Sequence, residues 1–438
     1  MSSDRFKGLV IILDGLGDRP CPELDGNTPL EFAHTPVLDQ LAQSNQCGLM
    51  DPLLPGLPVD THTSVGILFG LPPSVASCLC RGPIEAAGIG LDLHVGDLLL
   101  RANLATVEKH GPDFHIKDRR AGRIREHVDS LCRALEDINV GADILASLYP
   151  ATQHRCVLRL QGSHLSAQIS DTDPGGKGID QRILMSRADN NEDEIARRSA
   201  AAVNRFTEIS HDILSSHPVN KKRIQGNQLP ANGIITRGVG VHQNFNNLLA
   251  YLNLKVAVIA SESTILGLGN LFGFTTITDP AFTALPDTDL DKKLAFAKTA
   301  LATHDLVYLH IKATDTTAHD RNPQAKAEVI NRFDTALGKM VTGKMTSGKI
   351  NLEDTILGVC ADHSTDSYRG EHNGDPVPVL IHNPLGRKDR VNRFNETDCA
   401  TGALGRLTAQ SFLTSVLDAM GCLSNYKAAE MEYYRLTR

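Results

Sequence analysis

The chain has 438 residues, two to three times the usual length of a domain, so we expect one core domain with an inserted or appended second domain. Apolar residues make up 41% and charged residues 22%, which excludes a disordered or fibrous protein. The net charge of −7 and the isoelectric point near 6.2 give no general attraction to nucleic acid or anionic lipid, so we expect neither as a partner.

Its cellular location is predicted from the apolar runs, the N-terminus and the cysteines. Runs such as residues 8–13 and 256–260 are far shorter than the ~20 residues that span a bilayer, and are typical of buried strands. The segment Met1 to Lys7 lacks the apolar region and cleavage site of a signal peptide. Nine cysteines without regular spacing fit reduced thiols. We therefore expect a cytoplasmic protein.

The predicted elements begin with an apolar strand over residues 8–13, which delivers Asp14 to the following loop. Strand ends are where α/β sheets form their sites. From residue 91 to about 229 the character changes, because charged helical stretches at 123–138 and 191–215 alternate with short strands. This pattern indicates a separate α+β module.

Strand-like runs return after residue 230 and alternate with helical patterns, which predicts a largely parallel sheet flanked by helices. They lie at residues 233–236, 255–260, 306–311, 355–361 and 377–381. Prolines flank the last run, as in an edge strand. The sequence thus predicts an α/β fold with a split core domain, residues 1–90 and 230–438, and a smaller inserted α+β domain, residues 91–229.

A carboxylate and an imidazole follow the strand predicted over 306–311. Asp315 and His319 are four residues apart, so on a helix both face the same side and can bind one divalent ion. The alternative interpretation is an ordinary solvated helix start with Asp315 near its cap.

A second such pair follows the strand predicted over 355–361. Asp362 and His363 lie where the strand turns into a loop, and there adjacent side chains can converge on a metal. His372 adds an imidazole nine residues later, whereas His382 fits a structural role better.

Mixed carboxylate and imidazole ligands suit Mn²⁺, Zn²⁺, Mg²⁺ or Co²⁺, and these side chains exceed what one ion needs. Two ions a few ångströms apart stabilise the attacking and leaving oxygens in phosphoryl transfer. The sequence therefore predicts a two-metal phosphoryl-transfer enzyme. Its predicted metal ligands are Asp14, Asp315, His319, Asp362, His363 and His372. No Rossmann or Walker motif is present, so we expect no nucleotide cofactor.

Six motifs together point to one family. They are Ile12 to Pro20, Thr28 to Glu31, Arg81-Gly82-Pro83 with Glu85-Ala86, Asp118 to Ile124, Lys312 to Asp320, and Ala361 to Pro378. In these motifs the whole chain resembles the cofactor-independent, or 2,3-bisphosphoglycerate-independent, phosphoglycerate mutases. The likeness is to the archaeal-type branch, within the alkaline phosphatase superfamily.

The resemblance implies an alkaline-phosphatase-like core with an inserted domain that binds the substrate and closes over it. It implies two metal sites, with Mn²⁺ the favoured ion. One site would comprise Asp14, Asp362, His363 and the nucleophile, the other Asp315, His319 and His372. In the family, phosphate passes through a phosphorylated side-chain hydroxyl, while glycerate stays bound and reorients.

The nucleophile is where this sequence departs from the family. The family's Ser-Asp-Thr-Ala-His stretch is replaced by Thr61-His62-Thr63-Ser64-Val65, and an ungapped count puts Thr61 at the serine position. A threonine hydroxyl can perform the same chemistry and bind the metal, although its methyl group restricts the rotamer. Thr63 and Ser64 remain alternatives. The family's histidine falls on Val65 and its aspartate on His62.

The resemblance also implies a basic pocket for the anionic substrate, because guanidinium groups bind carboxylates and phosphates in bidentate pairs. Lys312 would add a positive charge beside the transferring phosphoryl group. The predicted substrate ligands are Arg81, Asp118, Arg119, Arg120, Arg123 and Arg237. A salt-bridged turn is the alternative for residues 118–123.

The leading hypothesis is a mutase that interconverts 3- and 2-phosphoglycerate, small phosphorylated hydroxy acids, through a phosphothreonine at Thr61. One alternative is a homologous mutase for a phosphoglycerate analogue, such as a phosphonate intermediate of a biosynthetic pathway. A metal-dependent phosphatase and a catalytically inactive binding protein are further alternatives. The sequence leaves the metal and the oligomeric state open.

Overall fold

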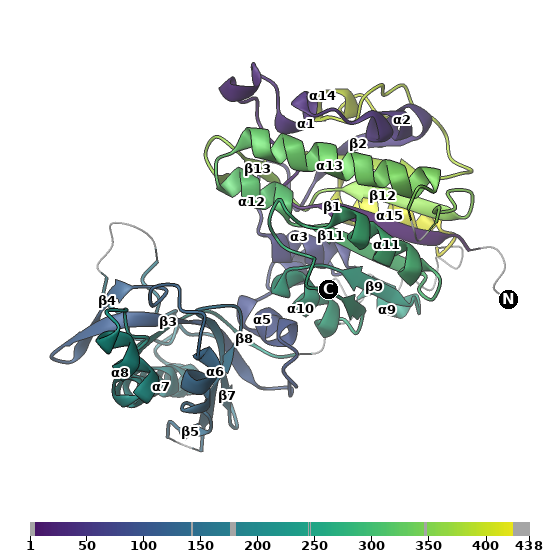
Figure 1. The fold of residues 1–438 in the computed structure, drawn as a ribbon. Helices are drawn as coiled ribbons and strands as arrows, with labels where there is room; N and C mark the ends of the chain where they lie inside the picture. The colour runs from purple at the N-terminus through teal and green to yellow at the C-terminus, as the bar shows by residue number, and fades with distance from the viewer. Residues whose placement is uncertain are drawn as a thin grey trace. The chain divides into compact units, whose positions relative to one another are not determined.

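The computed structural model describes residues 5–423, except residues 142, 176–180, 244, 246 and 346–347. The chain divides into two compact units (Figure 1). Unit 1 comprises residues 1–79 and 245–438, and unit 2 comprises residues 80–244. The boundaries expected from the sequence lie at about residues 90 and 230.

Unit 1 is built on a mixed, mostly parallel sheet. Its strands are β1 (Lys7–Leu13), β2 (Gln46–Asp51), β9 (Val256–Ile259), β10 (Thr275–Ile277), β11 (Leu306–Ile311), β12 (Thr355–Cys360), β15 (Val377–His382) and β16 (Gly405–Thr408). Their order across the sheet is β10-β9-β11-β1-β12-β15-β2-β16. β15 is antiparallel to both neighbours, and the other neighbouring pairs are parallel. The predicted α/β fold with a largely parallel sheet is confirmed.

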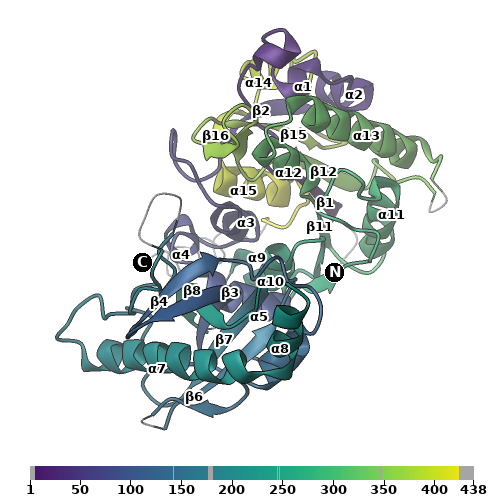
Figure 2. The same ribbon diagram turned by 60° about the vertical axis from the view of Figure 1, so that its left-hand side comes forward.

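Helices cover both faces of this sheet, which explains why β1, β11 and β12 are almost uniformly apolar and buried. The helices of unit 1 are η1 (Pro22–Leu24), α1 (Pro29–Phe32), α2 (Pro36–Ser44), α3 (Thr61–Leu68), α4 (Pro73–Ala76), α9 (Leu248–Tyr251), α10 (Ser263–Leu271), α11 (Leu290–Leu301), α12 (Ala313–His319), α13 (Pro323–Thr342), α14 (Glu396–Cys399) and α15 (Ala409–Ala419). Helices α2, α11 and α13 lie on one face, and α3, α10 and α15 on the other (Figures 1 and 2).

The strand predicted at an edge, β15, lies inside the sheet, so this expectation is wrong. β15 pairs with β12 over residues 380–382 and with β2 over residues 377–381. Pro378 therefore lies beyond the part of β15 that pairs with β12. A proline, which has no N–H to donate, is tolerated there because one side of the strand needs no ladder hydrogen bond.

Unit 2 is an α+β module whose strands are β3 (Leu98–His110), β4 (Asp113–Asp118), β5 (Ile138–Asn139), β6 (Leu145–Pro150), β7 (Arg155–Gln161) and β8 (Gly233–Val241). Its helices are α5 (Arg81–Gly88), α6 (Val128–Arg133), α7 (Glu194–Ser216) and α8 (Pro218–Gln225). The strand order is β4-β3-β7-β6-β5, and β8 also pairs with β3. Because α5 packs on β3 and β8 pairs with it, unit 2 begins and ends beyond the expected boundaries.

Alternation along β3 assigns the two faces of the sheet in unit 2. Leu98, Leu100 and their alternate neighbours share a core with α6 and α7. Leu99 faces the opposite way and packs against Ala86 of α5. Arg101, two residues after Leu99, lies on the same face and pairs with Glu85 of α5.

The helix predicted over residues 123–138 is largely wrong, because only α6 is helical there. Arg123 and His127 have φ angles of +57° and +62°, which a right-handed helix does not accommodate. The stretch has the charged composition of an exposed helix. Because Arg123 and His127 adopt the left-handed conformation, α6 begins only at Val128.

The described part of the chain contains no helix whose length and apolar content would let it cross a bilayer. The nine cysteines form no disulfide with one another in this structure.

Candidate metal centre and active site

The carboxyl ends of four adjacent parallel strands, β9, β11, β1 and β12, meet at one edge of the sheet of unit 1. Asp14 follows β1, Lys312 follows β11 and Asp362 follows β12. Parallel strands place the residues that follow them in a common crevice, which is how side chains far apart in sequence come together.

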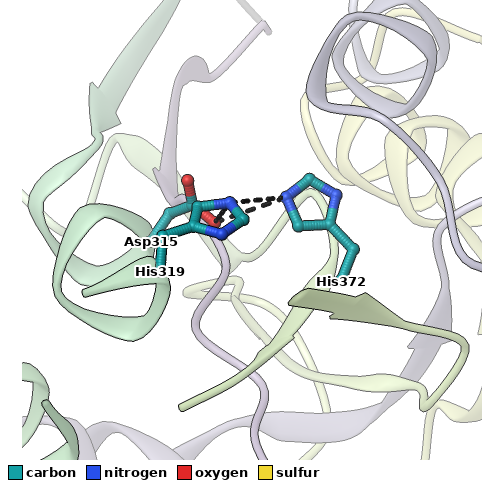
Figure 3. A group of neighbouring side chains, drawn as sticks. All are labelled: Asp315, His319 and His372. Carbon is teal, nitrogen blue, oxygen red and sulfur yellow. Dashed lines mark hydrogen bonds and ion pairs between the residues drawn. The ribbon is translucent and has the colours of Figure 1, made fainter. Parts of the chain in front are cut away.

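The outer group consists of Asp315, His319 and His372 (Figure 3). The Nε2 atoms of the two histidines are 3.2 Å apart and lie 3.4 and 3.5 Å from Asp315 Oδ1. Each Nδ1 donates to a backbone carbonyl, of Gly370 for His319 and of Val59 for His372. Both Nε2 lone pairs therefore point at one another, an arrangement that fits a shared cation.

The inner group consists of Asp14, Asp362 and His363, all fully buried. His363 Nε2 lies 3.4 Å from Asp14 Oδ1 and 3.2 Å from Asp362 Oδ2. Asp362 Oδ1 accepts the backbone N–H of Gly15, and Oδ2 faces His363 Nε2. Buried carboxylates need positive charge beside them, which a protonated His363 or a bound cation would supply.

The two groups adjoin one another. The rings of His363 and His372 stack with centroids 3.7 Å apart, and Asp14, Asp315 and His363 form a possible cation group that draws on both. Asp14 and Asp362 form another possible cation group with His310, a buried residue of β11. Thr365 Oγ1 donates to Asp315 Oδ1 at 2.8 Å and accepts from His363 Nδ1 at 3.1 Å. This bridge leaves Nε2 of His363 as its ligand atom, the orienting role that residues around metal ligands usually have.

The charges of the site shift the pKa values of its members strongly. Burial, together with the charge of Asp362, raises the pKa of Asp14. Burial alone would also raise the pKa of Asp362. The positive charges of His363 and Lys312 outweigh this effect and lower the pKa to about 2. Burial would lower the pKa of His363, but the charge of Asp362 outweighs it and raises this pKa to about 9. Nearby positive charge therefore stabilises the ionised form of these buried carboxylates.

The predicted nucleophile lies against the inner group. Thr61 is the first residue of α3, and its Oγ1 is 3.1 Å from His363 Nε2 and 3.5 Å from Lys312 Nζ. The positive end of the helix dipole favours negative charge on this oxygen. Thr63 and Ser64 are buried on the same helix, but among the described residues only Thr61 of the three hydroxyls bonds to a member of these groups.

Lys312 is the cation at the centre of the site. Its Nζ lies 3.0 Å from both carboxylate oxygens of Asp14 and 2.7 Å from Asp315 Oδ2. Burial would lower its pKa, but the charges of Asp14 and Glu262 outweigh it and raise the pKa well above the ordinary value. The side chain therefore remains an ammonium group.

Several of the predicted arginines come together in unit 2. Arg237 of β8 pairs with Arg101 of β3, whose Nη1 lies 3.2 Å from Glu85. Burial, with the charges of Arg237 and Arg81, lowers the pKa of Arg101 to about 10. The buried Nε atoms of Arg81, Arg101 and Arg237 and Nη1 of Arg119 donate to none of the described residues. Such a group of unsatisfied donors fits a bound anion.

The other predicted substrate ligands have different surroundings. Asp118 Oδ1 accepts the backbone N–H groups of Arg120 and Gly122, so this carboxylate holds the turn. Arg123 lines a separate cavity of about 380 Å³ with Arg223. The structure therefore brings together Arg81, Arg119 and Arg237 of the predicted set. Asp118 and Arg120 share a turn, and Arg123 lines the separate cavity.

Comparisons with known proteins agree with this architecture. A family profile described as 2,3-bisphosphoglycerate-independent phosphoglycerate mutase matches residues 42–220. A relative from Methanopyrus kandleri bearing that name is 37% identical to this chain, over 96% of the chain and 98% of the relative. The chain belongs to this family. The resemblance of the sequence motifs is thereby confirmed.

Two solved structures of the same architecture extend this family assignment. A protein from Pyrococcus horikoshii superposes with a TM-score of 0.80 at 30% identity, covering 96% of this chain and 98% of that one. The cofactor-independent phosphoglycerate mutase from Thermoplasma acidophilum superposes with a TM-score of 0.69 at 29% identity, covering 95% and 100%.

Two residues of this family member's site were missed by the sequence analysis. His310, the penultimate residue of β11, is fully buried, and its Nε2 is 2.8 Å from Asp14 Oδ2. Glu262, three residues after β9, lies 3.9 Å from Lys312 Nζ. The signals were a histidine inside an apolar strand and an acidic residue shortly after a parallel strand.

A buried lysine, Lys293, holds the backbone carbonyl of His310. β9 ends opposite Leu309, so the next carbonyl of β11 has no strand partner on that side, and the buried Lys293 Nζ donates to it at 2.9 Å. His310 Nδ1 has no hydrogen-bond partner among the described residues. His310 pairs with Ile12 of β1, and its Nε2 reaches Asp14 just beyond the end of that strand.

Metal binding should strengthen with rising pH. His363 with a pKa of about 9 is protonated in the metal-free protein at neutral pH, and a metal ligand must be neutral, so an incoming cation expels this proton. Below the pKa, the apparent Mn²⁺ affinity should rise by up to about tenfold per pH unit, and it should level off above it. Calorimetry in buffers of different ionisation heat measures the released proton, and a pH-independent affinity would contradict this account.

Replacing His310 should weaken metal binding, although this residue is not among the ligands predicted from the sequence. We expect His310→Leu to lower Mn²⁺ affinity by about 10- to 100-fold, because Asp14 loses the side chain that orients it. His310→Gln, whose amide can donate to Asp14, should lose less. Titration of both metal-free variants tests this, with circular dichroism to verify folding, and equal affinity of His310→Leu and the unaltered protein would refute the role.

Proposed function

We propose that this chain is a metal-dependent phosphoglycerate mutase that interconverts 3- and 2-phosphoglycerate through a phosphorylated Thr61. The observation that supports this most directly is the position of the Thr61 hydroxyl, 3.1 Å from His363 Nε2 and 3.5 Å from Lys312 Nζ. A hydroxyl at a helix N-terminus, beside a carboxylate and imidazole cluster, is suited to attack phosphorus. Family membership provides the substrate, since the relatives are named for it.

The metal content is part of the proposal. Two divalent ions would bind, one to Asp14, Thr61, Asp362 and His363, which lie around His363 Nε2, and one to Asp315, His319 and His372. Mn²⁺ is the favoured ion, with Mg²⁺, Co²⁺ and Zn²⁺ as alternatives, because the ligands mix carboxylates with imidazoles. Bound ions would supply positive charge to the transferring phosphoryl group.

The residues of the chain account for the remaining chemistry. Thr61 Oγ1 forms a bond to phosphorus as the bond from phosphorus to the substrate oxygen breaks, and the hydroxyl proton ends on that oxygen. Glycerate reorients, and its other hydroxyl takes the phosphoryl group back with the reverse proton movement. Lys312, charged and close to Thr61 Oγ1, stabilises the negative charge that spreads over the phosphoryl oxygens.

The arginines of unit 2 are proposed to bind the anionic groups of the substrate. Arg81, Arg119 and Arg237, joined by Arg101, have buried donors without partners among the described residues, and carboxylate or phosphate oxygens would satisfy them. In this division of roles unit 1 binds the metal ions and unit 2 contributes substrate binding.

A homologous mutase for a phosphoglycerate analogue remains the second candidate. It is favoured by the stretch after Thr61, where the family's histidine is replaced by Val65, which is fully buried on α3 and has no polar atom to offer a substrate. A changed neighbour of the nucleophile is the kind of substitution that alters substrate choice.

The test is phosphorus NMR of the Mn²⁺-loaded protein with 3-phosphoglycerate. We expect 2-phosphoglycerate to form, Thr61→Ala to lower the rate by roughly 10³-fold or more, and Thr61→Ser to retain activity, because only the alanine lacks a nucleophile. Thr63→Ala is the matched variant, and a comparable loss there would move the nucleophile to Thr63. Free phosphate as the sole product would indicate a phosphatase, and no reaction despite bound metal would favour an analogue as substrate.

A further inference from the structure

Glu262 is an acidic residue of the site that belongs to none of the possible metal groups. It follows β9, whose carboxyl end lies at the same edge as those of β11 and β1, and it precedes α10. Its Oε2 is buried and accepts no hydrogen bond from any described residue. A buried carboxylate oxygen is expected to face a positive charge. The positive group that it faces is Lys312 Nζ, 3.9 Å away.

Lys312 contacts the oxygens that a cation would need. Its Nζ lies within 3.0 Å of both oxygens of Asp14 and 2.7 Å from Asp315 Oδ2. These two carboxylates form a possible cation group with His363. The ammonium group therefore neutralises, in this structure, the carboxylates that would bind divalent ions.

Divalent ions and the ammonium group compete for the same oxygens. When ions bind to Asp14 and Asp315, like charges repel Lys312 from its present contacts. Among the described residues, the remaining carboxylate that forms an ion pair with Lys312 is Glu262. A small movement of the lysine toward Glu262 would keep a paired charge near Thr61, whose Oγ1 is 3.5 Å from Nζ.

We propose that Glu262 is a positioning residue that receives the Lys312 ammonium group when divalent ions bind, and holds it beside Thr61. The proposal rests on the proposed function for the use of Lys312 in catalysis, but its central statement concerns metal binding. Glu262 lowers the cost of displacing the lysine, so that the protein binds its ions more tightly than the same site without this carboxylate.

The test is a double-mutant cycle measured by calorimetric titration of Mn²⁺ into the metal-free protein. We expect Glu262→Gln to lower Mn²⁺ affinity by about tenfold, the lower end of what residues around metal ligands contribute. In the Lys312→Met background the same substitution should lower it by less than about threefold, because no displaced ammonium group needs a partner. Equal losses in both backgrounds would mean that Glu262 acts on the ions directly, and would overturn the proposal.

Two further variants separate this role from a structural one. Glu262→Asp retains the charge and should recover most of the lost affinity, and Glu353→Gln, which removes a charge from an exposed site of unit 1, should leave it unchanged. Thermal unfolding of each metal-free variant verifies folding. If Glu262→Asp binds as weakly as Glu262→Gln, the ammonium group does not depend on this carboxylate and the proposal fails.

The outcome is independent of the mutase assay, because the titration contains no substrate. Coupling between Glu262 and Lys312 in a protein that does not form 2-phosphoglycerate would contradict the proposed function and leave this inference standing. Mutase activity without coupling would contradict this inference alone.

Discussion

The structure depends on how three aspartates are held together away from water. Asp14, Asp315 and Asp362 are almost fully buried within one crevice of unit 1, where their mutual repulsion and desolvation oppose the folded state. Positive charge must therefore accompany them. Lys312 and a protonated His363 provide it in the metal-free chain, and divalent ions would provide more of it. The site is stable, in this view, because cations occupy it in every state.

Strand direction makes this concentration of charge possible. Strands β9, β11, β1 and β12 run in parallel, so the residues that follow them meet although they lie far apart in the sequence. The side chains around the ligands then fix their orientations, as Thr365 does for His363 and the carbonyls of Gly370 and Val59 do for the outer histidines. These side-chain and backbone contacts thus set the binding geometry before any ion arrives.

Much of this arrangement could be predicted from local sequence pattern. Apolar runs ending in Asp14, in Asp315 with His319, and in Asp362 with His363 indicate buried strands that deliver ligands to one edge. His310 and Glu262 were not predicted as site residues, because their roles depend on which strands are neighbours in the sheet. A single sequence does not reveal that order. The same limit explains β15, since its place between β12 and β2 follows from topology. The helix predicted over 123–138 failed because left-handed residues, which composition does not report, interrupt it.

The measurement that tests the account most directly is anomalous X-ray scattering from crystals grown with Mn²⁺ and collected at the manganese edge. We expect two peaks in unit 1, one among Asp14, Thr61, Asp362 and His363 and one among Asp315, His319 and His372. We also expect Thr61 Oγ1 to lie within coordination distance of the first peak. A single peak, or peaks remote from these side chains, would contradict the claim that this edge of the sheet is a two-metal centre.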